Sequence, residues 1–192
     1  MRKVLPAVIA AALMAVACTS GKYSGDKAAQ ALEAHLSASV DAPLKLDIRS
    51  LELTDSISLA TEFGRRTEIF QKRREKNEEL YIKYKSQGLQ KNSALKLEAV
   101  ESDMTILKML ERMQSEAESL GLLDKTAYYI YRFTAAAKAG GKSTMYDNCY
   151  FSITPSGEVI AIGRQLRDIS RSGGLAIPGY RELIKGGEEV QE

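Results

Sequence analysis

The spacing of apolar positions divides the chain into helix-like and strand-like stretches. From Asp26 to about Val40, apolar residues recur every three or four positions, which predicts an amphipathic helix. Ser24 or Asp26 can cap its start, and the segment before Pro43 ends it, because a proline disfavours helical geometry in the preceding residue. From Leu44 onward apolar and polar residues alternate, which is the period of a half-buried strand.

The alternation changes parity inside this strand. Leu46 and Ile48 share one parity, whereas the following apolar residues have the other: Leu51, Leu53, Ile57 and Leu59. A β-bulge near Ser50 would keep both apolar sets on one face of the sheet. Two separate strands are the alternative.

Two long helices of opposite charge are predicted next, over about 58–87 and 92–120, with Gly88 and Gly121 as C-terminal stops. The first carries eight basic and five acidic residues, and the second three basic and six acidic residues. Their similar lengths and short connection predict an antiparallel helical hairpin. We expect its seam to use Phe63, Ile69, Phe70, Leu80, Tyr81 and Tyr84 against Leu97, Val100, Met104, Leu107, Leu110 and Met113.

The period returns to two after the second long helix. Aromatic and alternating stretches predict strands over about 126–137, 145–154 and 158–163, the last two joined by a tight turn at 155–157. The remainder, 164–192, has no sustained period and is predicted to be an irregular tail with one helical turn near 181–185.

This order of elements predicts an α+β fold. The first helix packs on an antiparallel sheet of about four strands, and the helical hairpin, over 58–120, is inserted after the first strand. Residues 26–163 form the single domain. In topology alone it resembles the cystatin-like and NTF2-like helix-on-sheet modules of small bacterial lipoproteins, a resemblance that carries no catalytic residue across.

The N-terminal segment has the composition of an export signal. Arg2 and Lys3 precede an apolar run over 4–16, and Ala15-Val16-Ala17 stands directly before Cys18. The stretch resembles the signal peptide of a bacterial lipoprotein, with Ala15 to Cys18 in the place of the lipobox. That resemblance implies removal of 1–17, a lipid on Cys18, residues 18–25 as the lipidated cysteine and its tether, and a place in the cell envelope.

This segment has two alternatives to lipidation, a membrane-spanning helix and a plain secretory signal. An apolar helix of about 13 residues rises only about 20 Å, which is short of the roughly 30 Å hydrocarbon core of a membrane. A plain secretory signal, cleaved without lipid attachment, remains the alternative. Thr19 after Cys18, with no acidic residue there, favours the outer over the inner membrane by resemblance to lipoproteins of that kind.

Charge and cysteine content narrow the function classes. The chain has 27 basic and 25 acidic residues, and Arg2 and Lys3 would leave with the signal, so the two signs become equal in number. This balance disfavours a nucleic-acid-binding protein. Cys149 is the only cysteine besides Cys18, so no intrachain disulfide is expected once Cys18 is acylated.

Several motifs invite a chemical interpretation. Gly140 to Thr144 ends like a phosphate-binding loop, but position 136 is alanine, so a strand connector is favoured. His35 is the only histidine, and we expect it at the surface. Cys149 lies in an alternating stretch and is expected to be buried. The tyrosines and phenylalanines of 126–154 suit a sheet core, with a ligand groove as the alternative.

The basic run over 71–76 is expected to be a solvated helix face. Glu62 and Arg66, and likewise Glu68 and Lys72, stand four positions apart with the acidic residue first, which suits helical ion pairs. A role facing anionic headgroups is the weaker alternative.

Together these observations predict a membrane-anchored envelope lipoprotein that acts as a non-enzymatic binding module, with a protein or glycan partner. They indicate no cofactor, no metal and no nucleic acid. The alternative is an envelope hydrolase or thiol enzyme using Cys149 with His35.

Overall fold

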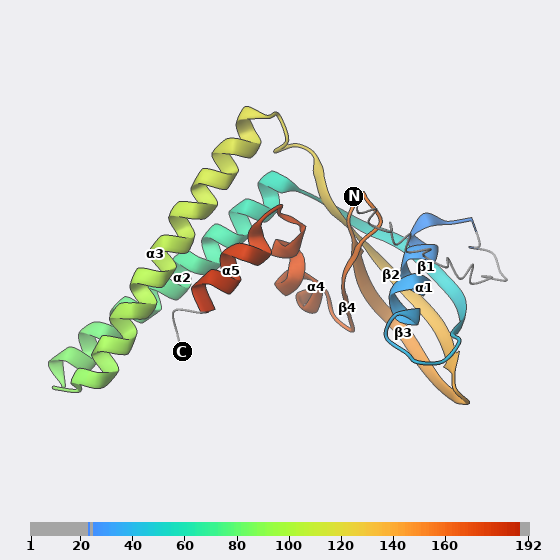
Figure 1. Cartoon of the computed structure of the whole chain (residues 1–192), viewed down its shortest axis with the longest axis horizontal. Helices are drawn as coiled ribbons and strands as arrows, with labels where there is room; N and C mark the ends of the chain where they lie inside the picture. The colour runs from blue at the N-terminus through green and yellow to red at the C-terminus, as the bar shows by residue number, and fades with distance from the viewer. Residues whose placement is uncertain (1–22, 24, 189–192) are drawn as a thin grey trace, which may run out of the picture.

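The computed structural model describes Tyr23 and residues 25–188. Cys18, the segment before it and most of the tether lie outside the described residues. The fold is α+β, as predicted (Figure 1). Its elements in chain order are α1 (Lys27–Ser37), β1 (Lys45–Ser58), α2 (Leu59–Ser86), α3 (Gln90–Ser119), β2 (Thr126–Ala139), β3 (Lys142–Ile153), β4 (Val159–Gly163), α4 (Leu166–Ser172), the 3-10 helix η1 (Gly173–Ala176) and α5 (Tyr180–Glu188).

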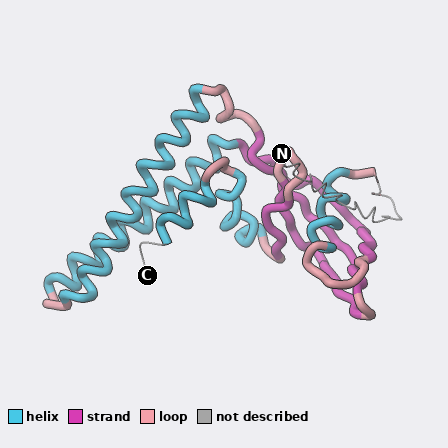
Figure 2. The backbone as a smooth tube through the Cα atoms, in the orientation of Figure 1, coloured by secondary structure: helices cyan, strands magenta, loops and turns pink. Residues whose placement is uncertain are grey.

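The sheet is an antiparallel meander with the strands in the order β1-β2-β3-β4. Gly140 and Gly141 form the turn between β2 and β3, and their φ angles of +54° and +77° lie in the region that favours glycine. Figure 2 shows the strands at one end of the molecule and the hairpin of α2 and α3 at the other, with α4 between them beside β4.

β1 is one continuous strand with the predicted bulge. The register passes from Ile48 opposite Ala135 to Ser50 opposite Thr134, so Arg49 is the extra residue and Leu51 returns to the face of Ile48. The alternative of two separate strands is wrong. A second shift, between Leu53 and Asp55, reverses the parity again. Ile57 therefore faces the opposite side of the sheet, and the expectation that it shares the face of Ile48 was wrong.

These register shifts allow the sheet to serve two hydrophobic cores. On one face α1 lays Ala28, Leu32 and Leu36 against Phe133 and Phe151. Asp26 caps this helix by accepting hydrogen bonds from the backbone N–H groups of Ala28 and Ala29, at 2.8 and 3.1 Å. The packing of the first helix on the sheet is therefore as predicted.

The second core lies where the hairpin leaves the sheet. Ile57, Tyr128 and Ile130 of the sheet pack there with Phe63 of α2 and Leu110 of α3. The loop before β2 is fastened to the same place, because the N–H groups of Leu59 and Ala60 each donate a 2.9 Å hydrogen bond to a carbonyl of that loop.

The C-terminal segment completes this second core. The prediction of an irregular tail was wrong, although α5 includes the helical turn expected near 181–185. Residues 164–188 form α4, η1 and α5, and they bury Ile169, Ile177, Tyr180 and Leu183. Each of these helices has nine residues or fewer, so none carries enough turns to display a helical period in the sequence. Tertiary contacts stabilise them instead.

The helical hairpin forms after the first strand, as predicted, and its turn is tightly specified. Gly88, with φ of +72°, follows the last residues of α2, and its N–H donates to the Lys85 carbonyl at 3.2 Å. The Leu89 N–H donates to the Tyr84 carbonyl at 2.9 Å. This pair of hydrogen bonds is a Schellman motif, which reverses the chain in a fixed geometry.

The seam of the hairpin differs in part from its prediction. Phe63, Phe70, Val100 and Leu110 are buried as expected, whereas the predicted seam residues Ile69, Leu97 and Met104 are exposed by 40% or more. Asp103 takes a fully buried seam position instead, where its carboxylate accepts hydrogen bonds from Arg73 and, at 3.3 Å, from Asn77. Sequence spacing could not reveal this, because a paired aspartate can replace an apolar residue at a seam.

Candidate functional site

A buried polar network joins the root of the hairpin to the C-terminal helices. Arg66 Nε lies 2.5 Å from Glu62 Oε1, and the two side chains are exposed by only 5% and 0%. The Tyr128 hydroxyl donates to Glu62 Oε2 at 2.9 Å. Burial, with the Glu62 carboxylate beside it, raises the pKa of Tyr128, so the phenol stays protonated as the donor.

The same arginine holds the end of α4. Its guanidinium donates to the carbonyls of Ser170 and Arg171, which lie in the last turn of that helix. Gly173 then allows the chain to pass directly over the network, since a Cβ there would stand 2.5 Å from the Tyr128 hydroxyl. The network therefore fixes α4 and η1, and through them the position of α5.

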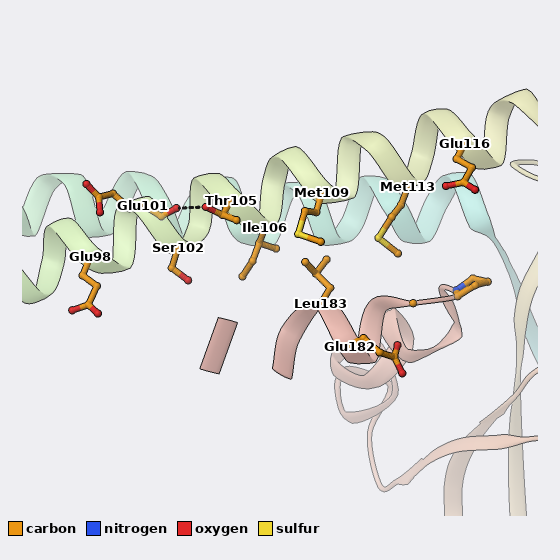
Figure 3. Close-up of a pocket in the computed structure, with 12 residues that line it drawn as sticks. Glu98, Glu101, Ser102, Thr105, Ile106, Met109, Met113, Glu116, Glu182 and Leu183 are labelled. Atoms are coloured by element: carbon orange, nitrogen blue, oxygen red, sulfur yellow. Dashed lines mark hydrogen bonds between the residues drawn. The ribbon is translucent and has the colours of Figure 1, made fainter. Parts of the chain in front are cut away.

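The fixed position of α5 creates a groove along α3. The groove has a volume of about 680 Å³, and Figure 3 shows Met109 and Met113 of α3 pointing toward Leu183 of α5. Ile106 adds to the same apolar floor. The three α3 residues stand three and four positions apart, so they form a stripe along one side of the helix, beside α5 (Figure 3).

The rim of this groove is acidic. Glu98, Glu101, Glu116 and Glu182 line it, and among its described lining residues there is no lysine, arginine or histidine. Figure 3 shows Glu98 and Glu101 at one end of the α3 stripe and Glu116 at the other. Such a surface can bind an apolar side chain and, beside it, a positively charged group.

The structure does not bring Cys149 and His35 into a hydrogen bond with each other among the described residues. Cys149 lies in β3, is 5% exposed and packs in the core beneath α1, as predicted for a buried strand cysteine. Burial raises the pKa of its thiol, which reduces the thiolate fraction that nucleophilic chemistry needs. His35 lies on α1 with its side chain exposed, as expected.

The other motifs of the sequence have structural roles in the fold. Gly140 and Gly141 form a strand turn, as expected, so the string that follows them enters β3 rather than a helix N-terminus. Of the two predicted ion pairs, Glu68 and Lys72 are solvated, whereas Glu62 and Arg66 are buried. The basic run over 71–76 is exposed apart from half-buried Arg74, as expected, whereas the C-terminal segment covers the pair of Glu62 and Arg66 at the root of α2.

The aromatic residues of the sheet form core and not an open groove. Phe133 and Phe151 are fully buried, and their rings meet edge to face with centroids 5.5 Å apart. Tyr131 stacks on Phe151 at 5.4 Å and Tyr146 lies 5.7 Å from Phe133. Because α1 packs over these rings, the interpretation as sheet core is confirmed.

The described part of the chain has neither a metal-binding cluster nor a membrane-spanning helix. Among those residues, no three or more His, Cys, Asp or Glu side chains gather so as to hold a metal ion. No described helix combines the length and apolar composition needed to cross a bilayer.

Comparison of the chain with protein-family models, with curated proteins and with solved structures found no match. The function must therefore be argued from the residues of the chain itself.

Sequence reasoning missed the groove because it treated α5 as part of an irregular tail. One signal was available: Ile106, Met109 and Met113 follow a helical spacing, while three glutamates of α3 stand before and after them. Only Met113 of these apolar residues was expected in the seam, and the role of the stripe depends on a helix from a distant part of the chain.

Proposed function

We propose that this protein is a membrane-anchored envelope lipoprotein that acts as a non-enzymatic binding module, and that the groove between α3 and α5 holds its partner. The observation that carries the proposal is the apolar floor of Ile106, Met109 and Met113 within an acidic rim. Met109 is 47% exposed although it stands in this stripe. Methionine side chains adapt to varied partner surfaces, which suits a protein-binding groove.

The charge of the groove indicates the chemistry of its partner. Four carboxylates with no basic residue among the described lining residues repel an acidic segment and attract a basic one. The groove also runs along a helix, so its floor matches apolar residues spaced by three and four positions. The best-fitting partner is therefore a cationic amphipathic helix of another protein.

Anchoring is the second part of the proposal and depends on the N-terminal sequence. Ala15 to Cys18 resembles a lipobox, and α1 begins nine residues after Cys18, which would hold the folded part close to its membrane. Metabolic labelling with radioactive palmitate tests this. Label is expected on the wild-type protein and not on Cys18→Ser, and equal labelling of the two would contradict it.

The groove can be tested with a synthetic probe and the methionines of the chain. The probe is a helical peptide of about 14 residues with leucines at positions i, i+3, i+4 and i+7 and lysines elsewhere on its surface. With ¹³C-methyl methionine labelling, we expect the NMR signals of Met109 and Met113 to shift on titration. Met104, 41% exposed on the same helix but outside the groove, and Met145 in β3 provide internal controls.

Matched substitutions complete this test. Met109→Lys adds a positive charge to the groove floor and should weaken binding of the lysine-rich peptide by about tenfold or more. Met104→Lys makes the same change on an exposed site outside the groove and should alter binding by less than about twofold. Equal effects of the two substitutions, or equal binding of a peptide with glutamates in place of the lysines, would refute the groove as the binding site.

A further inference from the structure

The outer end of the helical hairpin has a composition unlike the rest of the hairpin. Residues 80–97, which span the end of α2, the turn and the start of α3, contain four lysines and no acidic residue. We call this segment the hairpin tip. The groove, by contrast, carries three glutamates farther along α3 and one on α5. Two surfaces of opposite charge therefore lie on one hairpin.

The hairpin tip also exposes large apolar side chains. Ile82 is 65% exposed, Leu95 57%, Leu89 44% and Leu97 40%. Figure 1 shows that the tip projects away from the sheet and from α1, and that α5 lies nearer the root of the hairpin. None of the described core clusters includes these four residues. The apolar groups thus stand in water, where their exposure is unfavourable unless a partner covers them.

The tip presents these groups in a fixed shape. The Schellman motif at Gly88 holds Leu89 at the apex. Ile82 and Leu95 stand six and seven residues from Gly88, so they lie about 10 Å below the apex along the helix axes. Lys83, Lys85 and Lys91 lie within the same depth.

The hairpin tip is complementary to the surface of a lipid bilayer. It places lysines, exposed apolar groups and tyrosines within about 10 Å of a protruding end. Apolar groups of peripheral proteins enter the bilayer by about 5–10 Å, while lysines contact the anionic headgroups. Tyr81 and Tyr84, both partly buried at the tip, are of the residue type that favours the membrane interface. Nucleic acid is a poorer match, because the exposed apolar groups would gain little from a phosphate backbone.

We propose that the hairpin tip is a membrane-contact site that inserts its apex into a bilayer surface containing anionic phospholipid. The site does not depend on the groove between α3 and α5 or on a lipid at Cys18. It gives the protein a second contact with a membrane, at the end of the molecule opposite to α1 (Figure 1).

Vesicle flotation tests this proposal with the chain from residue 18 carrying Cys18→Ser, so that no acyl group contributes to binding. We expect binding to vesicles of phosphatidylcholine with 30% phosphatidylglycerol, a fall on raising NaCl from 50 to 500 mM, and little binding to phosphatidylcholine alone. The triple substitution K83Q/K85Q/K91Q removes three charges and should weaken binding on the order of a hundredfold, since each lysine near an anionic surface contributes about a factor of five.

Two further variants separate charge from apolar contact. K45Q/K138Q/K142Q removes the same number of exposed charges from the sheet and should bind as the parent does. Leu89→Ser and Ile82→Ser together keep every lysine but should lower binding and abolish quenching of a fluorophore at Gln87 by lipids brominated in the acyl chain. Circular dichroism checks that each variant keeps its helix content.

Several outcomes would overturn the inference. These are equal binding to neutral and anionic vesicles, equal losses from the tip and sheet triple variants, or an unchanged affinity in the apolar variant. The protein could also sediment in the absence of vesicles. If the tip substitutions abolish that sedimentation, the tip is a self-association site instead. Failure of the peptide titration at the groove would leave these measurements unaffected.

Discussion

Substitution of Arg66 by methionine should destabilise the protein far more than the loss of an exposed ion pair would. The methionine keeps much of the aliphatic volume but leaves Glu62 buried without its 2.5 Å partner. Loss of one member of a buried pair costs about 3–5 kcal/mol. The lower end applies here, because Glu62 keeps the Tyr128 hydroxyl at 2.9 Å and Arg65, 38% exposed, lies 3.8 Å away.

A loss of about 3 kcal/mol is a large share of the 5–15 kcal/mol typical of whole domains. For a chain of this size it corresponds to a fall in Tm of roughly 6–12 °C. Urea denaturation followed by circular dichroism measures the free energy of unfolding. Hydrogen exchange should also show faster exchange in α4 and η1, since Arg66 no longer holds the carbonyls of Ser170 and Arg171.

The same helix supplies the matched control. Lys72 pairs with Glu68 at 2.6 Å with the same spacing, but the two side chains are 72% and 63% exposed. Lys72→Met should therefore leave the urea midpoint nearly unchanged. Adding Glu62→Gln to Arg66→Met should recover part of the loss by removing the buried charge. Equal costs for Arg66→Met and Lys72→Met would refute the assignment of a buried, stabilising network.

Three other substitutions or modifications test the packing. Cys149 should react with a thiol reagent much more slowly in the native protein than in urea. Because burial raises the pKa of its thiol, the reaction rate should still rise above pH 9. A rapid reaction in the native protein would contradict its burial. Gly173→Ala should cost about 1–3 kcal/mol in urea denaturation, because its Cβ would stand 2.5 Å from the Tyr128 hydroxyl, and an unchanged midpoint would argue against that close packing. Asp103→Ala should lower the free energy of unfolding by about 1–3 kcal/mol, because it leaves Arg73 and Asn77 without their acceptor in the seam. Hydrogen exchange in the outer half of the hairpin should also become faster. An unaltered exchange pattern there would contradict the role of Asp103.

Local patterns were sufficient where a structure depends on neighbours in the sequence. The bulge near Ser50 follows from a change in parity, and the hairpin turn at Gly88 follows from a glycine between two helical stretches. The placement of Cys149 inside the sheet core also follows from alternation along its own strand. In each case the determining residues lie within a few positions of one another.

Local patterns failed where the partner is distant. Glu62 and Arg66 have the spacing of a surface ion pair, and only the C-terminal segment, more than 100 residues away, makes that pair buried. From the sequence, Asp103 is expected to be a solvent-facing residue of an acidic helix. The structure places it in the seam, where it pairs with Arg73 of the other helix. Charge spacing is the same for solvated and buried pairs, so the sequence contains no local signal that separates them.

By itself, then, the sequence determines the α+β class, the helix over the sheet and the inserted hairpin, because periodicity and turn residues act over short distances. The tertiary structure alone decides that the last helices form a second core and that α5 makes an acidic groove along α3. Those features arise from segments of nine residues or fewer, which are too short to show a period and are stabilised by contacts with remote parts of the chain.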